Sequence, residues 1–240
     1  MQARTWGGVL EGHTIDLADW REALIPPFDP WIELWVIGDS ERHVLRSKGF
    51  EDVLDSQDAH ARATILVAKL NGAFAIRTRA EPVILQGVAD KSPDGTIRQH
   101  VVVALGGAQA RGRAGAISSG NAAPPAPSTI QTWLALADRD DLVDDLLVHQ
   151  SKAANWYDLY KVFEDVKKLC DTGEPLKQRS WCPIDAQITA FRHTANFYRH
   201  SLAEPSQRNP PKKAMLLSEA SEMIRLMATG VLMDLSASGL

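Results

Sequence analysis

The chain has 240 residues, of which 45% are hydrophobic and 23% are charged, and its formal net charge is −4. This composition excludes a disordered or fibrous protein, and the length suits one large domain or two small ones. The amino terminus lacks the pattern of a secretory signal, and no apolar run approaches the roughly 18 residues of a membrane span. We therefore expect a cytoplasmic protein with no membrane partner and with two free cysteines, Cys170 and Cys182. No Cys or His spacing typical of zinc occurs, so neither a metal nor another cofactor is expected.

The first part of the chain mixes strand and helix patterns. Strand patterns cover residues 7–17, 31–37, 73–79, 82–89 and 96–105, and a turn containing Pro and Gly joins the last two. A short helix is expected over 17–24 and a longer one over 56–71, ending at Asn71 and Gly72. We predict an α+β domain over residues 1–105, with an antiparallel sheet and one main helix.

A segment rich in Gly, Ala, Ser and Pro separates this part from the rest. It covers residues 106–128 and contains almost no bulky apolar residues, which predicts a flexible linker. Helical periodicity then predicts short helices over 132–137 and 142–149, long helices over 155–170, 184–200 and 218–235, and a Pro-rich loop over 203–213. These helices predict a helical bundle domain over residues 129–240.

Charge is unevenly distributed in this second half. Residues 138–145 hold five acids and one base, whereas residues 176–213 hold seven Lys or Arg against two acids, a balance of 7 − 2 = +5. A basic segment in an acidic protein either favours an anionic ligand or pairs with the acidic segment.

The helix expected over 184–200 concentrates polar side chains on one face. Each residue advances about 100° around a helix axis, which places two Arg-His pairs and an amide on a shared arc of roughly 120°. These residues are Arg192, His193, Asn196, Arg199 and His200. The opposite side carries apolar residues and is expected to face the core. They are Ile184, Ile188, Phe191, Ala195 and Tyr198.

This polar arc suits phosphate binding and proton transfer. Arg192 and Arg199 would bind a phosphate, because a guanidinium donates to two oxygens at once. His193 or His200 would transfer protons, because imidazole titrates near neutral pH, and Asn196 would orient a hydroxyl. Such a set of side chains can cleave RNA without a metal.

Supporting carboxylates are expected on the helix over 155–170. Its polar side holds Tyr157, Lys161, Glu164 and Lys168. Asp158 or Glu164 would orient a histidine across a helix interface, although a solvated surface explains both residues as well. His149 is interpreted as a helix-end residue.

The polar arc also has structural explanations. Arg199 and His200 lie in the last turn, where cations are favoured by the helix dipole. Arg192 and His193 are either solvated or paired with the acids of residues 138–145.

Two motifs carry a resemblance to known proteins. WYDLYKVFEDV and FRHTANFYRH resemble a WxDLYKxxE helix and a TANxxRH helix of a group of uncharacterised bacterial proteins. The helical half is also loosely similar to the HEPN superfamily. That resemblance implies a small helical bundle, usually dimeric, that in many members is a metal-independent ribonuclease of a toxin or antiviral system.

The Arg-to-His spacing departs from the HEPN signature, in which four to six residues separate the two. Seven residues lie between Arg192 and His200, and Arg199 is followed directly by His200. Our leading hypothesis is a HEPN-like defence or toxin-type protein that acts on RNA, in the catalytic case as a metal-independent endoribonuclease. The alternatives are a non-enzymatic binding or assembly module, whose Arg/His helix forms a dimer or partner interface, and a structural Arg-His network between the two domains.

Overall fold

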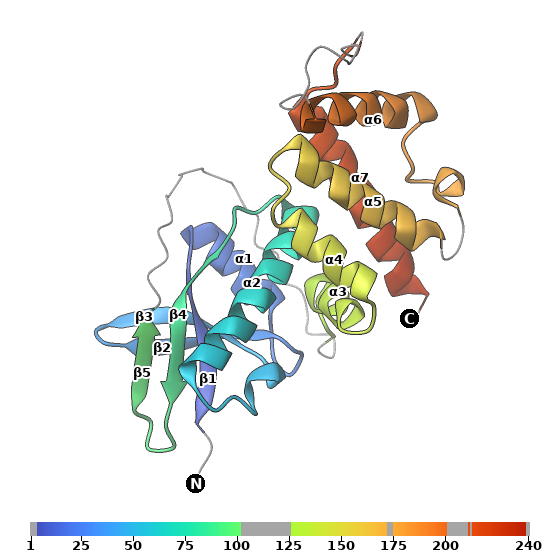
Figure 1. Cartoon of the computed structure of the whole chain (residues 1–240). Helices are drawn as coiled ribbons and strands as arrows, with labels where there is room; N and C mark the ends of the chain where they lie inside the picture. Colours follow the sequence, from blue (N-terminus) through green and yellow to red (C-terminus); the bar gives the residue numbers. More distant parts are fainter. Residues whose placement is uncertain (1–3, 102–125, 172–174, 201–210, 212, 239–240) are drawn as a thin grey trace. The chain divides into compact units, whose positions relative to one another are not determined.

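The computed structural model describes residues 4–101, 126–171, 175–200, 211 and 213–238, except for the side chains of Arg199 and His200. Within these ranges the chain forms a five-stranded antiparallel sheet and seven α-helices (Figure 1), which confirms the α+β class. Most of the linker predicted at 106–128 and of the loop predicted at 203–213 lies outside the described residues. None of the described helices combines the length and the apolarity that a membrane span requires.

The chain divides into two compact units, which are described separately. The sheet unit comprises residues 1–68 and 80–132, and the helical unit comprises residues 69–79 and 133–240. The division falls inside helix α2 (Ser56–Thr78) and inside helix α3 (Thr129–Ala137). The helical unit therefore also includes a segment from the first half of the chain.

The sheet has the strand order β2-β3-β1-β4-β5, and every neighbouring pair is antiparallel. The strands are β1 (Thr5–Glu11), β2 (Trp31–Ile37), β3 (Ser40–Arg46), β4 (Ile84–Lys91) and β5 (Ile97–Val101). Strand β2 has the predicted bounds. Strand β3 was not predicted, because the polar residues of its first half, which are exposed, hide the strand pattern.

Helix α1 (Thr14–Ala23) begins earlier than predicted and shortens the first strand. The His13 side chain accepts a hydrogen bond from the amide of Ile15 at 3.3 Å and so caps the helix. The strand pattern over 7–17 is therefore wrong beyond Glu11, where β1 ends.

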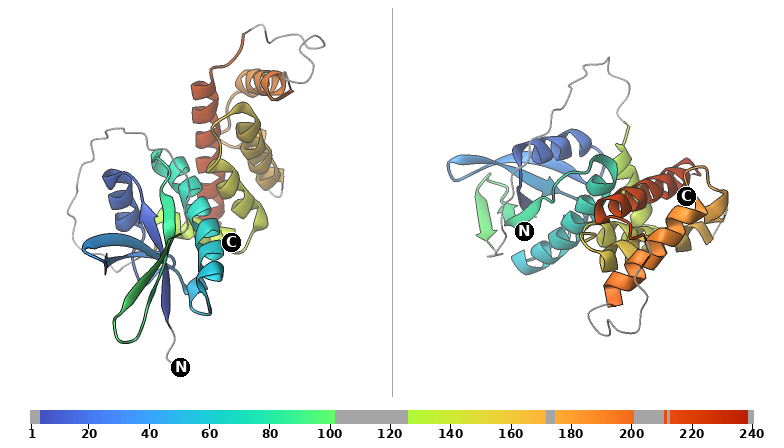
Figure 2. Two further views of the ribbon diagram at one scale, coloured as in Figure 1. Left: turned by 60° about the vertical axis from the view of Figure 1, so that its left-hand side comes forward. Right: turned by 90° about the horizontal axis from the view of Figure 1, so that it is seen from above.

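Both faces of the sheet are packed. Residues of the first half of α2 cover one face, where the buried cluster contains Trp6, Phe50, Val53, Ala59, Ala63 and Val88. A second cluster on the other face contains Val9, Trp35, Val44 and Ala89. The edge strands β2 and β5 also contact each other, so the strongly twisted sheet curls over this second face (Figure 2).

Helix α2 does not end at Asn71 and Gly72, and the strand predicted over 73–79 is wrong. The helix continues to Thr78, with buried Ala73, Phe74 and Ile76. Gly72 is needed for close packing, because a Cβ there would overlap the carbonyl oxygen of Leu147 in α4.

The end of α2 is fixed within the helical unit by charged side chains. Arg225 donates to the carbonyl oxygen of Ile76 at 2.8 Å, in the last turn of α2. Glu222 accepts two hydrogen bonds from Arg225, both 2.9 Å long, and pairs with Arg79 at 2.6 Å. Arg79 follows the last turn of the helix with a φ of 59°, a left-handed conformation that ends it.

The rest of the helical unit is an assembly around α5 (Trp156–Asp171). Helix α5 contacts α4 (Asp141–Gln150), α6 (Asp185–His200) and α7 (Leu217–Ala237). Figure 1 shows α5 between α4 and α6, with α7 behind. The sequence predicted all four helices, with ends within a few residues of those observed.

Candidate functional site

Helix α6 is held by an aromatic cluster on its buried face. It begins two residues after Pro183, and its buried residues in the described part are Phe191, Thr194 and Ala195. The ring of Phe191 lies 6.3, 6.2 and 5.4 Å from the rings of Trp156, Tyr160 and Phe163 in α5. This packing fixes the rotation of α6 and therefore the direction of its other face.

The predicted apolar stripe of α6 is buried only in its middle. Ile184 is 68% exposed and Tyr198 is 45% exposed, so the expectation that both face the core is wrong. The ring of Tyr198 stacks on Trp156 at 5.7 Å, at the first residue of α5, where little of the helix remains to cover it. Both ends of α6 therefore present apolar surface.

The polar arc is only partly described, and its described members lie on the expected side. Arg192 and His193 are exposed, and neither makes a hydrogen bond or ion pair within the described ranges. Asn196 is half-buried. Arg199 and His200 belong to the same helix, but their side chains lie outside the described residues.

The two predicted supporting carboxylates do not join this arc. Asp158 accepts a hydrogen bond from the side chain of Asn155 at 2.7 Å, and Asn155 caps the start of α5. Glu164 is exposed. Neither carboxylate bonds to Arg192 or His193. Among the described residues, no group of three or more His, Cys, Asp or Glu side chains is arranged to hold a metal.

One side of α5 carries a row of polar side chains, which we call the α5 strip. It consists of Tyr157, Lys161, Glu164 and Lys168. Tyr157 is 53% exposed, and the ammonium of Lys161 lies 4.5 Å from the centre of its ring. The strip therefore combines an exposed aromatic ring with two cations and one carboxylate, and the ring and the cations suit the bases and the backbone of a nucleic acid.

The α5 strip lies between α6 and α4. At about 100° per residue, the strip occupies an arc between Tyr160, which packs on α6, and Asp165, which bonds to α4. The remaining side of α5 is buried and faces α7, which it contacts.

Arg192 and the strip both face away from α7. The hydroxyl of Thr194 accepts a hydrogen bond from the amide of Met215, two residues before α7, so this edge of α6 faces α7. Arg192 is about 160° around the helix from Thr194 and so faces away from α7. The strip and Arg192 together form what we call the basic surface.

A histidine and a buried carboxylate border this surface on the α4 side. His149 Nδ1, in the last turn of α4, lies 2.6 Å from Asp165 Oδ2 in α5. Asp165 is buried, whereas the His149 side chain is 30% exposed. Lys168 Nζ lies 3.6 Å from the other oxygen of Asp165, so imidazole and ammonium converge on one carboxylate.

Sequence reasoning placed His149 at a helix end, which is correct, but it did not find its partner. The available signal was Asp165 itself, a carboxylate among the buried positions of α5 next to Val166 and close to Val162. A charged residue on an apolar stripe is seldom buried without a partner. Which side chain supplies that partner depends on the packing of two helices.

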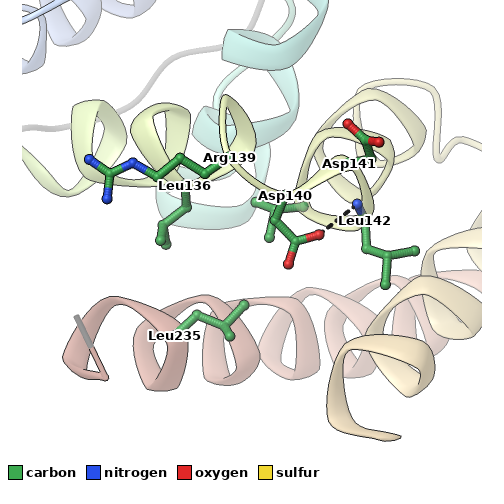
Figure 3. A pocket seen from close by; sticks show the side chains of 7 residues that line it. Leu136, Arg139, Asp140, Asp141, Leu142 and Leu235 are labelled. Carbon is green, nitrogen blue, oxygen red and sulfur yellow. Dashed lines mark hydrogen bonds between the residues drawn. The ribbon is translucent and has the colours of Figure 1, made fainter. Parts of the chain in front are cut away.

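Two acids of residues 138–145 serve the structure of α4, and among the described side chains none of the five pairs with Arg192 or His193 of α6. Asp140 accepts a hydrogen bond from the amide of Leu142 at 2.9 Å and caps α4, while Asp144 pairs with Lys69. A pocket of about 370 Å³ lies beside this cap, against the end of α7 (Figure 3). Its lining is Leu136, Arg139, Asp140, Asp141, Leu142, Val143 and Leu235, which includes none of the basic surface.

The sheet unit has its own histidine and carboxylate pair. His100 Nε2 in β5 lies 2.9 Å from Oδ1 of the buried Asp90 in β4. The ring of Trp6 lies 5.5 Å from His100, and Arg4 lies 3.6 Å from the other oxygen of Asp90.

A second polar cluster of the sheet unit is centred on Glu33. Its carboxylate accepts hydrogen bonds from the indoles of Trp31 at 2.8 Å and Trp35 at 2.7 Å. Burial favours the neutral acid, but these two donors and the nearby Arg46 outweigh it and lower the pKa of Glu33. Arg46 also lies over both indole rings, so each of these groups is already bound to another of the cluster.

Cys170 does not suit a nucleophile. Burial raises the pKa of its thiol to about 11, so little thiolate exists at neutral pH.

No protein-family model, curated protein or solved structure matches this chain.

Proposed function

We propose that this chain is a HEPN-like protein of a defence or toxin type, which binds RNA on the basic surface and cleaves it without a metal. One observation carries the proposal: Arg192 and His193 are exposed on a firmly packed helix and have no partner within the described ranges. A guanidinium and an imidazole that face solvent from a firmly packed helix suit an external anion.

The mechanism assigns separate roles to the groups of α6. Arg192 and Arg199 hold the phosphate and stabilise the charge that develops on it. His193 or His200 transfers a proton, and Asn196 orients the attacking hydroxyl. Lys161 adds a further phosphate contact, while the exposed ring of Tyr157 offers a base-stacking surface. We propose that the protein acts in the cytoplasm and needs no cofactor.

Incubation with RNA in EDTA tests the proposal. We expect the wild type to cleave RNA, and the His193→Ala/His200→Ala double variant to lose about 10²-fold or more in rate. Full activity of that variant would remove this assignment of the α6 histidines. Arg42→Ala removes an exposed charge from the sheet unit and serves as a matched control for Arg192→Ala in RNA binding.

A second candidate function is assembly through α6. The observation that favours it is the exposure of Ile184 and Tyr198 at the two ends of that helix. In this case the helix forms a homodimer or partner interface. Light scattering on the purified chain tests it. A wild-type dimer that becomes a monomer in Ile184→Asp supports the interface. The same mass for the wild type and the variant contradicts it.

A further inference from the structure

The His149 and Asp165 pair has the geometry of an aligned general base. Asp165 is buried and fixed on α5, and its carboxylate oxygen lies 2.6 Å from His149 Nδ1. A carboxylate at Nδ1 holds the ring in one orientation and places the lone pair of the neutral imidazole on Nε2.

The other nitrogen of His149 is open to a ligand. Nε2 makes no hydrogen bond within the described part of the chain, and the side chain is 30% exposed. The imidazole is therefore partly exposed, and one of its nitrogens has no hydrogen-bond partner among the described residues. A histidine that only ties two helices together needs neither property.

A cation lies beside the imidazole, on the α5 strip. The Lys168 ammonium is 3.6 Å from Asp165 Oδ1, and the Lys168 side chain is 58% exposed. Because His149 and Lys168 approach the two oxygens of one carboxylate, a phosphate that contacts Lys168 is brought close to His149. Lys161, two turns before Lys168 on the same strip, extends this cationic path along α5.

We infer that His149 is the general base of RNA cleavage and that Asp165 is its positioning residue; this inference rests on the proposed function. Nε2 of His149 takes the proton of a ribose 2′-hydroxyl, and the 2′-oxygen forms a bond to the adjacent phosphorus. The bond from phosphorus to the 5′-oxygen breaks, and its electron pair leaves with that oxygen, which takes a proton from the α6 histidine to which the proposed function assigns proton transfer. The products are a 2′,3′-cyclic phosphate and a 5′-hydroxyl, and His149 returns its proton to solvent.

The test compares the two histidine and carboxylate pairs of the chain on a short, labelled single-stranded RNA in EDTA. We expect His149→Gln to lower the cleavage rate by about 10²–10⁴-fold with unchanged RNA affinity. Asp165→Asn keeps the shape of the partner but not its charge, so we expect a loss of similar order. His100→Gln, which breaks the equivalent pair in the sheet unit, leaves the rate unchanged.

A rescue experiment separates chemistry from folding. In His149→Ala, added imidazole restores part of the rate if His149 acts as a base, whereas a structural role gives no rescue. Wild-type rates in His149→Gln would overturn this inference and leave the proposed cleavage standing. A wild type that binds RNA without cleaving it would overturn this inference and the cleavage, but not the RNA binding. A wild type that neither cleaves nor binds RNA would overturn the proposed function itself.

Discussion

The chain contains two histidines paired with a buried carboxylate, one in each unit, and their surroundings differ. In the sheet unit, His100 packs near Trp6, and Arg4 approaches the other oxygen of Asp90. In the helical unit, His149 borders the α5 strip, and the exposed Lys168 of that strip shares its carboxylate. His100 meets its carboxylate through Nε2, whereas His149 does so through Nδ1 and borders the α5 strip, so we propose a base role for His149 alone. The neighbours of a histidine, more than its hydrogen bond, decide which role is available.

Each pair also lies beside a glycine contact, and disrupting these contacts gives the largest expected effects. A Cβ at Gly72 would overlap the backbone of Leu147, two residues before His149, and a Cβ at Gly87 would overlap the carbonyl of His100. We expect Gly72→Ala to lower the free energy of unfolding by about 3 kcal/mol and Gly87→Ala by about 1–2 kcal/mol. Urea titration measures both.

Gly49→Ala is the control for this pair of substitutions, because a Cβ there meets only the Ser47 hydroxyl, at 3.4 Å. If Gly72→Ala unfolds at the same urea concentration as Gly49→Ala, the close approach of α2 and α4 is wrong.

The second prediction removes each histidine. His149→Ala and His100→Ala each take the nearest partner from a buried carboxylate, so each is expected to cost about 1–3 kcal/mol of stability. His193→Ala removes an exposed imidazole and is expected to change stability by less than about 0.5 kcal/mol. A cost for only one of the two paired histidines would show that the other pair is absent in solution.

The third prediction concerns an ion network that contains no histidine. Hydrogen bonds from Arg225 lower the pKa of Glu222 to about 2, against an ordinary value of 4.5; partial burial opposes the shift, and Arg79 adds to it. Because the folded-state pKa is depressed, the stabilisation is fully present above about pH 4.5 and is lost as the pH falls toward about 2.

The Glu222 side chain is 37% exposed, so solvent screening limits this contribution to less than about 1 kcal/mol. Glu222→Gln should therefore be slightly less stable than the wild type at pH 7 and equally stable near pH 2, as measured by thermal unfolding at each pH. A difference that grows on acidification would contradict the assignment.

The sequence predicted the elements whose apolar residues recur with one clear period, either that of a helix or that of a strand. The helix over 184–200 follows from Phe191 and Ala195, and the polar face follows from its angular position. Residues 73–79 were assigned to a strand because Ala73, Phe74 and Ile76 form a short apolar run that fits either period. Only their packing in the helical unit decides for a helix.

The candidate site was harder to predict than the fold. The exposed positions of Arg192 and His193 were predicted, because exposure on a helix follows from local periodicity. The pairing of His149 with Asp165 was not, because it joins two helices whose contact depends on tertiary packing. The exposed positions of Ile184 and Tyr198 were missed for a related reason: the neighbouring helix covers only the middle of α6.

We propose that RNA contacts the helical unit on its basic surface, and the salt dependence of RNA affinity measures that contact. Fluorescence anisotropy of a labelled single-stranded RNA would be measured over a series of salt concentrations for the wild type, Arg192→Ala and Arg42→Ala. We expect Arg192→Ala to lower the slope of log affinity against log salt by about 0.7, the value of one lost phosphate contact, and Arg42→Ala to leave it unchanged. Equal slopes for all three proteins, or no binding by the wild type, would contradict the claim.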